Sequence, residues 1–151
     1  MTFHHLMLFV HVAAVVVWVG GMAFAHFCLR PAALTLSPAQ RLGLWARVFE
    51  HFFPMVWGAI ASLLFSGVVM LLEVGFATAP VSWHLMLVTG LIMSGVFASI
   101  WFGPWRVFRQ AVRVEDWARA AVALNRIRQR VGFNLTLGTL TIALATLGLA
   151  W

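Results

Sequence analysis

Charged side chains are scarce in this sequence. Only 9% of its 151 residues are Asp, Glu, Lys or Arg, whereas a soluble domain has about 25% charged residues. Hydrophobic residues make up 63% of the chain, so too few polar residues remain to form a surface that faces water. The composition therefore excludes a soluble globular domain and indicates an integral membrane protein, whose first partner is the lipid bilayer.

Several features that define other protein classes are also absent. The single cysteine, Cys28, cannot form an intrachain disulfide, so it does not indicate a redox compartment. The sequence contains no GxSxG nucleophile motif, no CxxC pair and no phosphate-binding loop. All ten basic residues are arginines, and they lie between the apolar runs. Because membrane topology explains this placement, we expect no nucleic-acid partner.

What the sequence does contain is four long apolar runs. They cover about residues 6–29, 52–72, 81–102 and 131–151. Each run is long enough to cross the hydrocarbon core of a bilayer as a helix. The sequence therefore predicts an all-α fold, in which residues 1–151 form a single domain that is an integral membrane four-helix bundle.

The segments between the runs predict further helix. Ser37-Pro38-Ala39-Gln40 has the pattern of a capping box with proline at the first helical position. Residues 114–131 place their apolar side chains on one helical face. We therefore expect helical extensions of the second and fourth spans on the cytoplasmic side.

The arginines predict the orientation of the bundle. They lie in the first and third connections, and neither the second connection nor either terminus has one. The positive-inside rule then places these two connections in the cytoplasm and both termini in the periplasm or outside the cell. We expect a multi-pass protein of the inner (cytoplasmic) membrane. Stripes of small residues, such as Gly58, Ser62 and Ser66, indicate close helix packing and leave a homo-oligomer open.

Histidines are the only concentrated source of chemistry, and there are six of them: His4, His5, His11, His26, His51 and His84. The predicted topology places His11 and His84 toward the outer side, and His26 and His51 toward the inner side. A polar residue inside a span is costly, so His11 is the first candidate for a site residue. Histidines at span ends are more often interfacial residues than ligands, and this alternative stays open for His4, His5 and His51.

The segment HVAAVVVWVGGMAFAHFCLRP, residues 11–31, resembles the opening helix of a known group of membrane proteins. This group comprises copper resistance protein D (CopD) and the HemJ-type protoporphyrinogen oxidases. Its members are small four-helix proteins that open with His, six apolar residues, Trp and then Gly, and that have a basic residue further on. The matching residues here are His11, Trp18, Gly21 and Arg30.

The resemblance implies a b-type haem with His11 as an axial ligand and Trp18 beside it. His84 would supply a second ligand, while His26 and His51 would allow a second haem. The oxidase branch has a lysine early in the third span, where this chain has Trp-His-Leu-Met at 83–86. That departure places protoporphyrinogen oxidation in doubt and leaves haem binding untouched.

The inner layer also offers partners for haem propionates. Arg30 and Arg47 lie near the inner histidines in the sequence, and guanidinium groups pair well with carboxylates. The first hypothesis is therefore a protein that binds one or two b-type haems and transfers electrons. It would act on a quinone, a porphyrinogen, a small oxidant or another redox partner, and the sequence leaves open whether it is an enzyme.

The alternative hypothesis is the handling or transport of copper. His4, His5 and Met7 cluster at the outer side with His84 and Met86, and imidazole and thioether ligands suit copper. Methionine is also an ordinary apolar residue, so these side chains do not by themselves distinguish the two functions. A structural or accessory membrane subunit is the third possibility.

Overall fold

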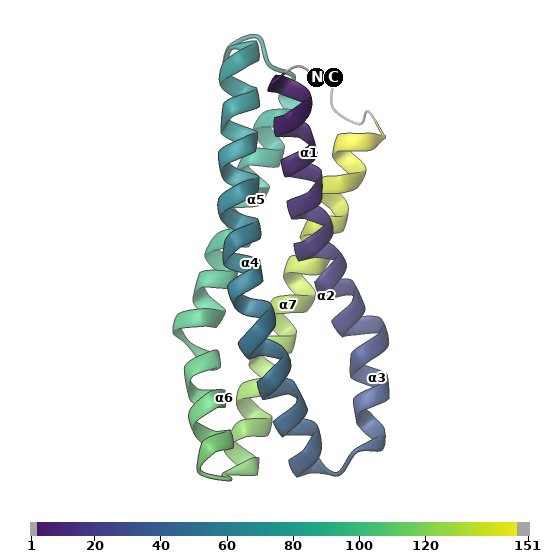
Figure 1. Ribbon diagram of the computed structural model, residues 1–151, viewed down its shortest axis with the longest axis vertical. Helices are drawn as coiled ribbons and strands as arrows, with labels where there is room; N and C mark the ends of the chain where they lie inside the picture. The colour runs from purple at the N-terminus through teal and green to yellow at the C-terminus, as the bar shows by residue number, and fades with distance from the viewer. Residues whose placement is uncertain (1–2, 148–151) are drawn as a thin grey trace.

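The computed structural model describes residues 3–147, which form long helices joined by short connections (Figure 1). The first helical stretch consists of α1 (Phe3–Val15), α2 (Gly21–Phe24) and α3 (Arg30–Ala32). Two π-helical turns, Val16–Gly20 and Ala25–Leu29, join these pieces, and a 3-10 turn at Ala33–Thr35 follows them. The remaining helices are α4 (Pro38–Val74), α5 (Val81–Phe102), α6 (Pro104–Arg113) and α7 (Trp117–Thr146).

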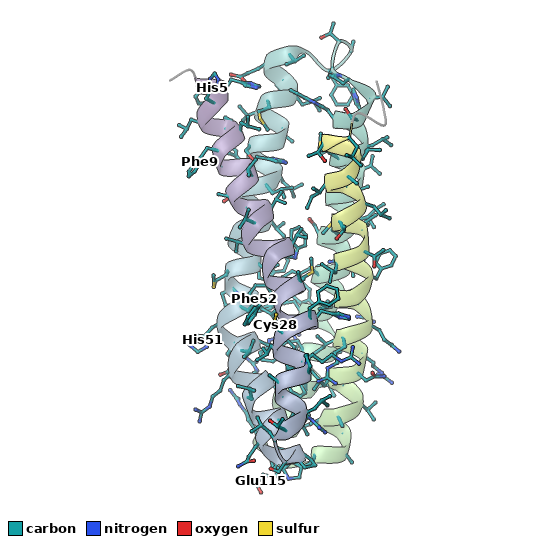
Figure 2. The ribbon with its side chains drawn as sticks, turned by 90° about the vertical axis from the view of Figure 1, so that its right-hand side faces the viewer. His5, Phe9, Cys28, His51, Phe52 and Glu115 are labelled. Atoms are coloured by element: carbon teal, nitrogen blue, oxygen red, sulfur yellow. The ribbon has the colours of Figure 1, made fainter. Side chains whose placement is uncertain are left out.

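The predicted all-α membrane fold is confirmed, since residues 3–147 contain no strand. Three stretches within these residues are long and apolar enough to cross a membrane: Phe3–Thr35, Pro38–Val74 and Val81–Arg113. The fourth predicted span, residues 131–151, ends outside the described residues, and its described part is the second half of α7. α7 packs along α5 and α6, so four helical stretches lie side by side (Figures 1 and 2).

The predicted extension of the second span begins where its sequence indicates. The Oγ atom of Ser37 accepts a hydrogen bond from the backbone N–H of Gln40 at 3.4 Å. The side chain of Gln40 accepts one in return from the backbone N–H of Ser37 at 3.3 Å. This capping box satisfies two N–H groups that the first helical turn leaves unpaired. α4 then continues through Pro54 to Val74 as one helix.

The third connection contains more helix than the sequence predicts. The chain becomes helical again at Pro104, where α6 begins shortly after the third span. Proline is suited to the first helical position because its fixed φ angle is that of a helix. The side chain of Asp116 caps α7 by accepting the backbone N–H of Arg119 at 3.0 Å. α6 and α7 therefore form an antiparallel hairpin that extends the bundle at its arginine-bearing end (Figure 1).

The core is concentrated in the half of the bundle that is nearest this hairpin. The rings of Phe49 and Phe53 stack with their centroids 4.7 Å apart. Trp105 and Phe108 of α6 pack against Phe49, with centroids 5.9 and 6.1 Å from that ring. These aromatic side chains fix α4 against α6 in this half of the molecule.

Candidate functional site

His11 lies in α1 and faces α4. Its Nδ1 atom is 3.1 Å from the Oγ atom of Ser66. A methyl group placed on Gly67 would lie 3.3 Å from Cε1 of the imidazole. The absence of a side chain at Gly67 therefore lets the ring approach α4 closely.

The hydrogen bonds of Ser66 indicate which nitrogen of His11 bears the proton. The Ser66 hydroxyl donates to the carbonyl oxygen of Ser62 at 2.6 Å. Because a hydroxyl has one proton, Ser66 accepts from the Nδ1–H group of His11, and Nε2 keeps its lone pair. A histidine whose Nδ1–H group is held by a hydrogen bond can offer Nε2 to a metal ion, as metal-ligating histidines do.

The contact between α1 and α4 has a register that places two methionines at the same level along the two helices. Near the start of α1, the Nδ1 atom of His4 lies 3.0 Å from the Oε2 atom of Glu73. Met7 lies three residues after His4 along α1, and Met70 lies three residues before Glu73 along the antiparallel α4. One more turn in each direction leads to His11 and Ser66, which are again in contact. Met7 and Met70 therefore lie at the same level, and their exposed fractions are only 7% and 8%.

His84 contacts the connection between α4 and α5, whereas His11 contacts α4. The Nδ1 atom of His84 lies 3.2 Å from the carbonyl oxygen of Pro80, and its Nε2 atom lies 3.0 Å from that of Phe76. Both ring nitrogens thus face carbonyl oxygens. In this position His84 stabilises the connection between α4 and α5 and presents no free nitrogen toward His11.

The first helix places two predicted site residues in its π-helical turns. Trp18, in the first turn, is 1% exposed and packs edge to face against Phe97 at a centroid distance of 6.5 Å. Trp18 is therefore a core residue at this level. His26, in the second turn, lines a cavity in the half of the bundle that is nearest the α6–α7 hairpin. π-helical turns are frequent at functional sites, which makes this cavity the second candidate site.

His51 and Arg47 are not among the residues that line this cavity. The Nδ1 atom of His51 lies 2.9 Å from the carbonyl oxygen of Arg47 on the same helix. Both side chains are exposed, and His51 points away from the bundle (Figure 2). Of the predicted inner-layer residues, the structure thus brings His26 and Arg30 together and leaves His51 and Arg47 outside.

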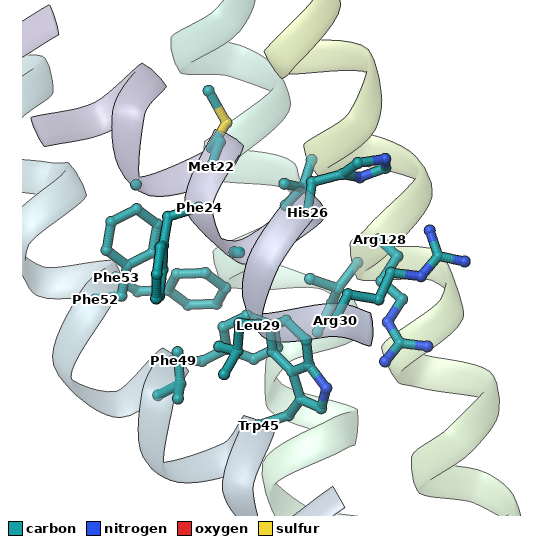
Figure 3. A pocket seen from close by; sticks show the side chains of 15 residues that line it. Met22, Phe24, His26, Leu29, Arg30, Trp45, Phe49, Phe52, Phe53 and Arg128 are labelled. Carbon is teal, nitrogen blue, oxygen red and sulfur yellow. The ribbon is translucent and has the colours of Figure 1, made fainter. Parts of the chain in front are cut away.

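The cavity has a volume of about 250 Å³, and its walls come from the first helix, α4 and α7. Figure 3 shows the aromatic rings of Phe49, Phe52 and Phe53 on one side and the basic side chains of Arg30 and Arg128 on the other. The cavity is therefore amphipathic. Its apolar part suits a hydrocarbon group, and its basic edge suits an anion.

The sequence did not single out two residues of this cavity, Trp45 and Arg128. The guanidinium carbon of Arg128 lies 5.3 Å from the ring centroid of Trp45. Burial lowers the pKa of Arg128, and the positive charges of Arg30 and Arg41 lower it further. Arg128 is one of seven arginines in the third connection, and no local pattern distinguishes it from the others. Its place in the cavity depends on its contact with Trp45, which joins α7 to α4, two helices that are distant in sequence.

Histidine and acidic side chains alone do not form a metal site in the described part of the chain. Within residues 3–147, no group of three or more His, Cys, Asp or Glu side chains is placed to hold a metal ion. A metal site among these residues would need other ligands, such as the thioethers of Met7 and Met70.

The long apolar helices and the polar groups between them define this chain as an all-α membrane protein. The family model for copper resistance protein D matches residues 46–147, about two thirds of the chain. The chain therefore belongs to the copper resistance protein D family. No curated protein and no solved structure matches it.

This match begins after the first helix, so it is independent of the motif at residues 11–31 on which the resemblance rests. It confirms the copper resistance protein D part of that resemblance. Protoporphyrinogen oxidase activity and haem binding stay predictions. The family description favours the alternative hypothesis, copper handling, over the haem hypothesis.

Proposed function

We propose that this protein handles copper in the membrane and binds Cu(I) between α1 and α4. The observation that carries the proposal is the level shared by Met7 and Met70, which are enclosed between the His4–Glu73 and His11–Ser66 contacts. His11 lies one helical turn from Met7 on the same face of α1, at a spacing that lets their side chains meet.

The chemistry of these side chains favours Cu(I) over the common cations of the cell. Thioethers are soft ligands that select Cu(I), while Mg²⁺ and Ca²⁺ require oxygen ligands. The Nε2 lone pair of His11 would supply a third ligand, which Ser66 holds in place through Nδ1. At the outer end, the Glu73 carboxylate would attract a cation toward the two methionines.

A competition titration tests this proposal. Purified protein in detergent, titrated with Cu(I) against a coloured chelator, is expected to bind one Cu(I) per chain. His11→Asn should weaken binding at least about tenfold, because it removes the imidazole ligand. His51→Asn is the matched control: His51 is exposed and bonds to its own helix, so this variant should bind as the wild type does. Equal affinity of the wild type and His11→Asn would contradict the proposed site.

Haem is a second candidate because His26 and two arginines line one cavity. An imidazole and guanidinium groups are suited to haem iron and to propionates, respectively. The cavity volume of about 250 Å³ is below the usual range for ligand pockets, about 300–1,000 Å³. The cavity as it stands therefore cannot enclose a whole, rigid porphyrin ring. A visible spectrum of the same preparation is decisive, because a stoichiometric Soret band would favour haem, and with it a quinone or other redox partner.

We also propose that both termini face the periplasm and that the arginine-bearing connections face the cytoplasm, as the positive-inside rule predicts. In a Cys28→Ser background, Thr78→Cys and Gln110→Cys place single thiols at exposed positions near opposite ends of the bundle. A membrane-impermeant maleimide should label Thr78→Cys in intact cells, and Gln110→Cys only after permeabilisation. Labelling of Gln110→Cys in intact cells would reverse the proposed orientation.

A further inference from the structure

The inner cavity contains hydrogen-bond donors that have no acceptor. Nε1 of Trp45 and both Nε and Nη2 of Arg128 are buried without a hydrogen-bond partner among the described residues. A buried donor without an acceptor is costly, and the cost is larger for a charged group. Three such donors on two adjacent side chains indicate that something with acceptor oxygens binds beside them.

The charges around these donors select an anion. Arg30 lines the same cavity as Arg128, and none of the described lining residues is acidic. Arg41 adds a further positive charge close enough to act on Arg128. Guanidinium groups bind phosphate through paired N–H donors, which gives both strength and orientation.

The rest of the cavity is apolar. Met22, Leu29, Phe52 and Phe53 contribute to its walls, and the basic side chains lie together at one side (Figure 3). A small inorganic anion would leave this apolar surface unfilled. A molecule with a hydrocarbon chain next to an anionic group would fill both parts.

The position of the basic side chains along the bundle matches the depth of a lipid headgroup. Arg30 directly follows the first apolar run, and Arg128 shortly precedes the fourth. Basic pockets between membrane helices at the cytoplasmic side are suited to anionic lipid headgroups. We propose that the cavity binds an anionic phospholipid, with its phosphate at Arg128 and Trp45 and part of an acyl chain among the aromatic side chains.

Native mass spectrometry of the detergent-purified protein tests this proposal. Phosphatidylglycerol should bind more tightly than phosphatidylcholine, because the net negative charge of its headgroup attracts the positively charged arginines. Arg128→Gln should weaken phosphatidylglycerol binding about tenfold or more, since it removes charge-assisted hydrogen bonds. Arg126→Gln is the matched control, because it removes the same charge from an exposed position on the same helix. This control should bind the lipid as the wild type does.

A second variant protects the test against loss of folding. Trp45→Phe keeps an aromatic ring under Arg128 and removes only the Nε1–H donor, so it should weaken phosphatidylglycerol binding less than Arg128→Gln does. Equal binding of the two lipids, wild-type binding by Arg128→Gln, or displacement of the lipid by inorganic phosphate would each overturn the proposal. The cavity shares no residue with the Met7–Met70 level, so the copper and lipid experiments fail or succeed independently.

Discussion

Replacement of both Met7 and Met70 with leucine is expected to weaken Cu(I) binding by more than about a hundredfold, because it removes both thioether ligands. Leucine has nearly the same volume as methionine, and such exchanges in a packed interface cost less than about 1.5 kcal/mol. The α1–α4 contact should therefore persist, together with the His4–Glu73 and His11–Ser66 pairs on either side. The competition titration with the coloured chelator measures the loss.

Met55→Leu is the control for this experiment. Met55 belongs to α4 as Met70 does, but 55% of its surface is exposed. Its replacement should leave Cu(I) affinity unchanged. If the double variant still binds Cu(I) with wild-type affinity, the thioethers are packing residues and copper binds elsewhere.

Phe108→Ala is expected to have the largest effect on stability, lowering the free energy of unfolding by about 3–5 kcal/mol. The Phe108 side chain is completely buried in α6, and its ring packs against both Phe49 and Trp105. Its truncation would leave a cavity where α6 joins α4 and α7. Unfolding in mixed detergent and SDS micelles, followed by helical circular dichroism, measures the change.

Phe65→Ala is the matched control, because it removes the same atoms from a side chain of α4 that is 62% exposed. It should change stability by a small fraction of the Phe108 effect. Equal destabilisation by the two variants would contradict the view that the aromatic cluster anchors the α6–α7 hairpin.

The helices and several of their ends could be predicted from the sequence because these features depend on neighbouring residues. The apolar runs give the length of the spans, and the capping box at Ser37 and Gln40 gives the start of α4. α6 was missed because it is short and polar on one face, and no apolar run identifies it. Its burial against α7 becomes evident only when the two segments are packed together.

The sites were less predictable because they depend on the register between helices that are far apart in the chain. His11 stood out because a polar residue in an apolar run needs a partner. The antiparallel packing of α1 on α4 makes Ser66 the partner of His11 and places Met7 level with Met70. The contact of Arg128 with Trp45 likewise joins residues more than eighty positions apart.

The two π-helical turns of the first helix have a consequence for the relation between its two ends. An i→i+5 hydrogen bond encloses one residue more than an α-helical turn does. Each extra residue turns all later side chains by about 100° around the helix axis. The turns at Val16–Gly20 and Ala25–Leu29 lie between His11 and Arg30, so they set the direction of Arg30 independently of that of His11. A single inserted or deleted residue in either turn would therefore rotate Arg30 away from its place at the basic edge of the cavity. The contacts of α1 with α4 would stay in register.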